Sequence, residues 1–432
     1  MKKVLIIGYL HPFTAQHKGS FRPLPLAKQL PEFGWQPIVL TGPLTKKTGV
    51  PFRVVETPYH DILAFWKKLF RLNPNAGIGE QLKKRLGIAN RKSLLDFFLT
   101  FGEEIFYYPD SAKGWKPLVL KAGEELLQRE DIEAIISCHP VTSHLVASDL
   151  KTRHNIPWIA DFADLWSQNH DYHYSPLRRV LDRRLELKTL SQADALVTVS
   201  EPWAGKLRAL HKGKPVYTIT HGFDPEEVNI PPASLTSRFT ITYTGAIYTG
   251  KQDPTKLFAA LRDLISDKAM EPSDIEVRFY GTGVVWLERE INRYGLSSVV
   301  KHYEHVPKEV AVGKQRESQL LLLLDWDDQN EKGVFPGKVF EYLGARRPIL
   351  TIGGSANDVV HKLLTETKAG IPAKDAPDIK RALAELYQEY KLRGGVAYNG
   401  MEGEINKYSH REMARKFAEI LDQLTANIPM GS

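Results

Sequence analysis

The segment Gly333–Leu350 combines a loop, a helix and a strand in an order that suits the binding of a phosphate group. A loop rich in glycine and proline leads into the short apolar helix Val339–Ala345, and the strand Ile349–Ile352 follows. The N-terminus of such a helix presents unpaired backbone N–H groups and the positive end of a dipole. Lys338 adds a cation there, and Glu341, one turn along, could accept hydrogen bonds from a ribose. An ordinary loop–helix–strand unit with a surface glutamate explains the same residues.

Glycines end two more of the expected strands in this half of the chain. Gly245 precedes Lys251, a cation that suits a diphosphate, and Gly281 and Gly283 end the next strand. In the other half, Gly19 lies in a long polar loop where a glycine lets a ligand approach the backbone closely. That loop is not G-x-G-x-x-G, which disfavours a nicotinamide or flavin cofactor. A solvated lysine and plain surface loops are the alternatives.

Carboxylates and a histidine follow strands of the N-terminal half. Asp161 and Asp164 come after the strand Trp158–Ala160, and His139 follows the strand Ala134–Ser137. These side chain types can transfer protons or orient a sugar. Asp164 could instead cap a helix, and His139 could be structural.

All these residues lie at the carboxyl ends of strands in two alternating series of strands and helices. The first series has strands at 4–7, 38–40, 134–137, 158–160, 195–199 and 216–220, and the second at 239–243, 276–280, 299–303, 320–324 and 349–352. Such alternation is typical of doubly wound parallel sheets, which bind ligands beyond the carboxyl ends of their strands. We therefore predict an α/β protein with two Rossmann-like domains.

Domain boundaries follow from composition. The proline-rich stretch 231–237 is the best linker, so we place an N-terminal domain at 1–230 and a C-terminal domain at 237–408. A terminal helix within 409–428 carries one apolar face, made of Ala414, Phe417, Ile420 and Leu421. A chain of 432 residues agrees with two domains.

The cysteine content and the apolar runs of the sequence also indicate the cellular compartment. Cys138 is the single cysteine, which excludes an intrachain disulfide framework and gives no support to a cysteine-based metal site. The N-terminus reads as a first strand, not as a signal peptide, and no apolar run approaches the ~18 residues of a membrane span. We expect a cytoplasmic protein, peripheral on the cytoplasmic face of the membrane.

The membrane expectation comes from a basic amphipathic insert at about 60–108. Between Asp61 and Lys92 the sequence has eight basic and two acidic residues, a local net charge of +6. This is nearly the whole net charge of +7. A helix over Asp61–Arg71 would place aromatic and aliphatic residues opposite Lys67 and Lys68, and Ser93–Phe106 repeats the theme. Such helices bind anionic membrane surfaces, here through 61–106, although many cover the core of their own domain.

Taken in order, these features resemble the retaining GT-B glycosyltransferases of family 4, especially the branch that builds bacterial surface polysaccharides. The matching segments are the loop at Gly19, Ser137–Pro140, Asp161–Trp166, Val199–Glu201, His221–Asp224, Tyr243–Gly245, Phe279–Gly283 and Phe335–Leu343. No resemblance is found from about 50 to 130.

The resemblance implies two domains that face each other across a cleft, with the C-terminal helix packing back on the N-terminal domain. It implies a hexosyltransferase that moves a sugar from a nucleoside diphosphate sugar, UDP-linked, to a lipid-linked or membrane-proximal saccharide, with retention. Neither a metal, a cofactor nor nucleic acid is expected. The implied donor-binding residues are Gly19, Gly245, Lys251, Gly281, Gly283, Val306, Pro336, Gly337, Lys338 and Glu341, and the candidate catalytic residues are Lys251, Asp164 and His139.

Three positions depart from the family pattern. Gly333 stands where a glutamate is common, Ala246 where many members have an arginine, and Ala163 where many have a histidine or arginine. Arg22, Lys338 and Arg346 are the cations that could compensate. The departures motivate one alternative, a catalytically weak accessory subunit that binds nucleotide or a partner transferase. A nucleotide-sugar 2-epimerase is another alternative with the same fold.

Overall fold

The structure is a computed structural model that describes residues 1–9, 22–44, 49–59, 73, 81, 104–172, 174–228, 233–281, 285–326, 331–355 and 357–426. These residues form two compact units. Unit 1 comprises Met1–Ile219 with Ala414–Ser432, and unit 2 comprises Thr220–Met413. This division does not test the predicted domain boundaries at 1–230, 237–408 and 409–428, which stay a prediction.

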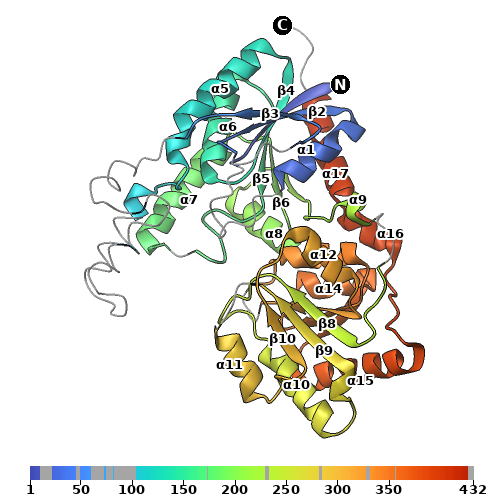
Figure 1. Cartoon of the computed structure of the whole chain (residues 1–432). Helices are drawn as coiled ribbons and strands as arrows, with labels where there is room; N and C mark the ends of the chain where they lie inside the picture. The colour runs from blue at the N-terminus through green and yellow to red at the C-terminus, as the bar shows by residue number, and fades with distance from the viewer. Residues whose placement is uncertain are drawn as a thin grey trace. The chain divides into compact units, whose positions relative to one another are not determined.

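Unit 1 is built on a seven-stranded parallel sheet with the strand order β3-β2-β1-β4-β5-β6-β7. Its strands are β1 (Lys2–Ile7), β2 (Trp35–Thr41), β3 (Arg53–Glu56), β4 (Ile132–Ser137), β5 (Trp158–Phe162), β6 (Ala195–Thr198) and β7 (Val216–Thr218). Its helices include α1 (Pro23–Gln29), α5 (Lys116–Arg129), α6 (Val141–His154), α7 (Pro176–Leu190) and α8 (Glu201–Leu210). Figure 1 shows α5 and α6 on one side of the sheet and α1 on the other.

Unit 2 repeats this plan with six parallel strands in the order β10-β9-β8-β11-β12-β13. The strands are β8 (Phe239–Thr244), β9 (Ile275–Tyr280), β10 (Val300–Tyr303), β11 (Leu320–Leu324), β12 (Ile349–Ile352) and β13 (Gly370–Ala373). The helices include α9 (Pro225–Val228), α10 (Thr255–Ser266), α11 (Val285–Arg293), α12 (Lys308–Arg316), α13 (Gly337–Ala345), α14 (Val359–Thr367), α15 (Ala376–Arg393) and α16 (Glu402–Ile405). The predicted pair of doubly wound α/β domains is confirmed.

The central strands read as continuous apolar runs because helices cover both faces of each sheet. β11 consists of five leucines, and all five are buried. In unit 1 the apolar run Val4–Ile7 of β1 is likewise completely buried. These runs are why the sequence predicts the middle of both sheets correctly.

Two edge strands, β3 and β13, were not predicted. β3 has no fully buried residue and β13 has one, so neither carries the apolar run that marks a central strand. Both strands owe their conformation to pairing with a neighbour, β2 or β12. The expected helices Asp61–Arg71 and most of Ser93–Phe106 lie outside the described residues. Across the described part of the chain, no helix is long and apolar enough to cross a membrane.

The last helix, α17 (His410–Ala426), packs against unit 1 from residue 414 onward. All four residues of its predicted apolar face are buried: Ala414, Phe417, Ile420 and Leu421. The Arg22 guanidinium lies 5.4 Å from the centre of the Phe417 ring, and the Trp35 indole N–H donates to Asp422 over 3.2 Å. The predicted return of the C-terminal helix to the N-terminal domain is therefore confirmed.

Phe417→Ala should lower the free energy of unfolding of unit 1 by about 3–5 kcal/mol, because the ring is fully buried and its loss leaves a cavity. Urea unfolding followed by circular dichroism measures the change. Leu392→Ala on α15 is the control, since Leu392 is 86% exposed and should change stability by less than ~0.5 kcal/mol. Equal effects of the two substitutions would contradict the packing of α17 described above.

Candidate functional site

Strand order reverses between β8 and β11 in unit 2, and such a switch point leaves a crevice at the carboxyl ends of the strands. The loop after β8 is fastened there by the buried Gln252, whose side chain N–H donates to the Leu324 carbonyl at the end of β11 over 2.7 Å. Gln252 also accepts from the Tyr248 N–H over 3.0 Å. Lys251 therefore lies at the switch point, with its ammonium 4.3 Å from the centre of the Trp326 ring.

Two of the predicted glycines meet at the ends of β8 and β9. The Gly245 N–H donates to the Tyr280 carbonyl over 2.6 Å, and a Cβ at Gly281 would lie 2.3 Å from the Gly245 oxygen. Gly245 also has a φ of +107°, which a side chain would strain. Glycine is thus required at both positions by the approach of one backbone to the other.

The Lys338 side chain lies on Gly245, one member of this pair. A Cβ at Gly245 would be 2.6 Å from Lys338 Cε, so a side chain there would displace the end of the lysine side chain. The Lys338 ammonium donates to the Ala246 carbonyl over 3.4 Å and is 5.0 Å from the centre of the Tyr243 ring. The structure therefore brings together three residues that lie far apart in sequence: Gly245, Gly281 and Lys338.

Helix α13 starts beside these residues. Its apolar face is buried, and Tyr342 links it to the sheet, because the Tyr342 hydroxyl accepts from the Thr244 N–H over 3.1 Å. Pro336 precedes the first helical residue, Gly337. Glu341 lies one turn along on the exposed side of the helix. The helix ends at Ala345, where Arg346 takes a left-handed conformation.

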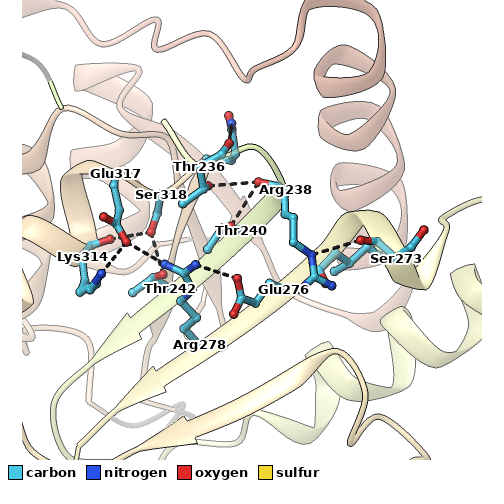
Figure 2. Close-up of polar contacts among 12 residues, drawn as sticks. Thr236, Arg238, Thr240, Thr242, Ser273, Glu276, Arg278, Lys314, Glu317 and Ser318 are labelled. Atoms are coloured by element: carbon cyan, nitrogen blue, oxygen red, sulfur yellow. Dashed lines mark hydrogen bonds and ion pairs between the residues drawn. The ribbon is translucent and has the colours of Figure 1, made fainter. Parts of the chain in front are cut away.

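Val306 follows β10 in the loop that leads into α12. A polar network holds α12 on the sheet (Figure 2): Arg278 on β9 bridges Glu276 over 2.7 Å and Glu317 over 2.8 Å, and Ser318 donates to Thr242 on β8 over 2.7 Å. Next to it, the Tyr280 and Tyr303 rings stack with centres 4.7 Å apart. These contacts position the loop of Val306 beside the end of β9.

A buried carboxylate lies next to Gly333, the position where the family pattern has a glutamate. Glu331 is 8% exposed and accepts from the Gly333 N–H over 3.4 Å. Asp358, the N-cap of α14, is close enough for Glu331 to help raise its pKa. Burial is the main cause, and it raises the pKa of Asp358 to about 6 against the hydrogen bonds from Val359 and Val360. Glu331 thus provides a carboxylate beside Gly333, although position 333 itself is not a glutamate.

In unit 1 the switch point lies between β1 and β4, and His139 follows β4 there. The Tyr9 N–H, after β1, donates to the His139 carbonyl over 3.4 Å. Asp164 follows the neighbouring strand β5 and is exposed. No helix starts at Asp164, because α7 begins only at Pro176, so the capping explanation does not apply. His139 and Asp164 therefore belong to the same edge of the sheet.

Asp161 and Asp164 follow the same expected strand in the sequence, but Asp161 is buried, whereas Asp164 is exposed. Asp161 forms an ion pair with the buried Arg22, 2.9 Å from Nε to Oδ2. Burial raises the pKa of Asp161, and Arg22 opposes that rise. The Arg22 guanidinium also donates to the Ile219 carbonyl over 2.7 Å. Arg22 is thus engaged inside unit 1 and is not an exposed cation that could compensate for the alanines.

Arg346 is engaged as well, in an ion pair with Glu402 and 5.3 Å from the centre of the Phe223 ring. Of the three compensating cations, only Lys338 lies at the glycine pair. Sequence reasoning missed Gln252 and Tyr342, which fasten the loop after β8 and the helix α13. Tyr342 has one sequence signal, a hydroxyl within an apolar helix pattern, whereas Gln252 lies in a polar loop that gives none. Gly19 and Gly283 lie outside the described residues, and the ligand-binding roles of all predicted site residues stay predictions.

Among the residues that the structure describes, no group of three or more histidine, cysteine, aspartate or glutamate side chains could hold a metal ion. The predicted metal-independent reaction nevertheless stays a prediction.

Residues 98–227 match the sequence profile of Glycosyltransferase Family 4. This match begins inside the stretch of about 50 to 130, where we had expected no resemblance. None of the curated proteins gives a significant match to the chain.

Solved structures with a similar fold cover nearly the whole chain at low sequence identity. A glycosyltransferase from Rickettsia africae has 14% identity and a TM-score of 0.57, with 99% of each chain covered. The α,α-trehalose 6-phosphate synthase from Burkholderia multivorans has 11% identity and a TM-score of 0.59, with 99% of each chain covered. A variant of TarM from S. aureus, in complex with fondaparinux, α-GlcNAc-glycerol and UDP, has 9% identity and a TM-score of 0.57, with 98% of this chain and 100% of the other covered. These similarities establish the fold, and with the family match they support a GT-B glycosyltransferase.

The raised pKa of Asp358 predicts a pH-dependent stability. The folded state holds this proton more tightly than the unfolded chain, so the free energy of unfolding should fall as the pH rises from about 4 to about 6. The loss attributable to Asp358 is about 2–3 kcal/mol. Asp358→Asn should remove it while keeping an N-cap, since asparagine caps helices as well as aspartate does.

Urea unfolding at several pH values measures this difference between wild type and variant. Asp375→Asn, at the exposed N-cap of α15, is the control and should keep the wild-type pH dependence. Parallel stability curves for wild type and Asp358→Asn would contradict the effect of burial on this carboxyl group.

Proposed function

We propose that the protein is a glycosyltransferase that moves a sugar from a nucleoside diphosphate sugar, UDP-linked, to a saccharide acceptor. The observation that carries this proposal is the cluster at the switch point of unit 2. Gly245 contacts both Gly281 and Lys338 there, and the N-terminus of α13 starts beside them. Backbone N–H groups, a helix dipole and a lysine form a site for a diphosphate.

Each part of the donor has a partner in this proposal. Lys251 and Lys338 neutralise the diphosphate. Pro336 and Gly337 form the N-terminus of α13, which faces the diphosphate in this proposal. Glu341, exposed one turn along α13, accepts hydrogen bonds from the ribose hydroxyls. Val306 and the loop after Gly281 border the base. UDP is the nucleotide in the TarM complex, and this supports a uridine donor.

The reaction breaks the bond between the anomeric carbon of the sugar and the diphosphate oxygen, which leaves with the electron pair. The acceptor hydroxyl forms the new bond to that carbon and releases its proton. Lys251 and the dipole of α13 stabilise the negative charge that develops on the leaving nucleotide, so no metal or other cofactor is required. His139 and Asp164, at the edge of unit 1, are the proposed groups for the acceptor and its proton. The resemblance favours retention of the anomeric configuration.

The acceptor in this proposal is a lipid-linked or membrane-proximal saccharide, as in polysaccharide or glycolipid assembly. The basic insert at 61–106 motivates this choice through its expected affinity for anionic lipid. The alternative is an accessory GT-B subunit with weak or no activity. The alanines at 163 and 246 are the observation that favours it.

Nucleotide-dependent thermal stabilisation tests the donor site. A ligand that binds only the native state raises the melting temperature, by a few degrees at a concentration ~100-fold above its Kd. We expect UDP to raise it more than GDP, dTDP or CMP do. If all four nucleotides leave the melting temperature unchanged, the proposed function fails.

The stabilising sugar nucleotide then separates transferase from the alternatives. Slow release of free nucleotide is the result expected of a transferase acting on water as a poor acceptor. An epimeric sugar nucleotide would identify an epimerase. Binding with neither product would favour the accessory subunit.

Lys251→Ala and Glu341→Ala should each weaken UDP binding about tenfold or more, because each removes a charged partner of the ligand. The two variants should differ with inorganic diphosphate, which has no ribose. Lys251→Ala should weaken diphosphate binding as well, whereas Glu341→Ala should not. Isothermal titration calorimetry measures both ligands.

The controls are Lys362→Ala on α14 and Glu385→Ala on α15, which change exposed residues of the same types in the same unit. Both controls should bind UDP like the wild type. Unchanged UDP affinity in both Lys251→Ala and Glu341→Ala, with native circular dichroism spectra, would refute the residue assignment.

A further inference from the structure

Helix α7 of unit 1 has an outer surface unlike that of an ordinary solvated helix. Its first two turns expose three aliphatic side chains: Leu177 is 61% exposed, Val180 48% and Leu181 41%. Leu187, further along, is 38% exposed. The same outer surface carries four exposed basic residues, Arg179, Arg183, Arg184 and Lys188. We call this set of eight residues the α7 face.

The acidic residues of α7 all point the other way. Asp182 and Glu186 are buried on the inner side, in line with the buried Arg178. Asp182 binds Arg178 Nε over 3.0 Å and accepts from the Tyr172 hydroxyl over 2.6 Å. Glu186 accepts from the Ser167 N–H over 3.0 Å and lies 3.2 Å from His211 Nε2. The helix therefore presents only positive charge to the outside.

The segment that precedes α5 extends the apolar part of the surface. Ile105 is 58% exposed and Phe106 is 48% exposed. This segment is tied to the start of α7, because Glu104 accepts from the Ser175 N–H over 2.8 Å. The Tyr108 hydroxyl also donates to the Leu181 carbonyl over 3.3 Å. Ile105 and Phe106 thus lie near the aliphatic end of the α7 face.

This concentration of exposed apolar residues is unusual. The described residues include 14 exposed large hydrophobic side chains, and seven of them lie in this region: Ile105, Phe106, Tyr174, Leu177, Val180, Leu181 and Leu187. An apolar surface of this kind, bordered by polar residues, marks a site of interaction with a protein or a membrane.

We infer that the α7 face, with Ile105 and Phe106, binds the surface of an anionic lipid bilayer. The charge pattern selects this occupant, since the face carries four cations and no carboxylate. Aliphatic residues gather in the first two turns, while Arg183, Arg184 and Lys188 lie further along the helix. The helix therefore enters the headgroup region obliquely, with its N-terminal end deeper and the basic residues against lipid phosphates. This inference extends the membrane-proximal acceptor of the proposed function to α7, and its test measures lipid binding and not sugar transfer, so either proposal can fail alone.

Vesicle co-sedimentation of the full-length chain tests the inference. Vesicles of phosphatidylglycerol mixed with phosphatidylcholine should bind the protein, pure phosphatidylcholine should bind it much more weakly, and added salt should release it. Leu177→Glu/Leu181→Glu and, separately, Arg183→Glu/Arg184→Glu should each weaken binding by about tenfold or more.

Matched controls keep the charge change constant. Val285→Glu/Leu392→Glu replaces two aliphatic residues that are 84% and 86% exposed in unit 2. Arg289→Glu/Arg293→Glu makes the matching change on α11. Both controls should bind vesicles like the wild type. Equal binding by the control and the α7 variants, with native circular dichroism spectra in all of them, would overturn the inference.

A fluorescent label locates the contact directly. Cys138 is the single cysteine and is buried, so a polarity-sensitive dye can be attached selectively to Leu181→Cys. Its emission should shift to the blue when anionic vesicles are added, whereas a dye on Leu392→Cys should not respond. No shift at position 181 would refute the inference. So would a shift that appears without lipid and rises with protein concentration, because it would assign the face to a second copy of the chain.

Discussion

The reversal of strand order in a parallel sheet is the constraint on which the rest of this structure depends. In each unit the chain builds outward from a central strand, β1 or β8, and then returns to the other side of that strand with β4 or β11. The helices on either side of the reversal diverge, which opens a space at the carboxyl ends of the strands. His139 follows β4 at this reversal in unit 1, and Lys251 follows β8 at the reversal in unit 2.

Much of this could be read from the sequence, because central parallel strands have a strong local signal. A run such as Leu320–Leu324 can only be a strand or helix that is buried all round, and its length favours a strand. The amphipathic pattern of α17 was equally clear, since its four apolar residues recur at helical spacing. Glycines after strands also indicated the candidate site, because β8 and β9 are each followed directly by one.

What could not be read depends on pairs of residues far apart in sequence. Nothing local distinguishes Asp161, which is buried against Arg22, from Asp164, which is exposed three residues later. Removing two charges from water is costly, and only the finished fold supplies the partner that offsets the cost. The edge strands β3 and β13 were missed for a related reason, since a neighbouring strand and not an apolar run determines their conformation. A family pattern compares single sequence positions. The glycine at 333 therefore gave no sign that the Glu331 carboxylate lies beside it.

The contact between Gly245 and Gly281 has an entropic consequence. Where two backbones touch without side chains between them, no rotamer remains to be frozen when a ligand arrives. In the proposed donor site, the wall formed by these strand ends therefore has no side chain to order when the donor binds. Long side chains such as Lys251 lose freedom on binding, whereas the glycine wall loses none. The ordering cost of the proposed donor binding would then fall on side chains such as Lys251 and Lys338, of which Lys338 lies against Gly245.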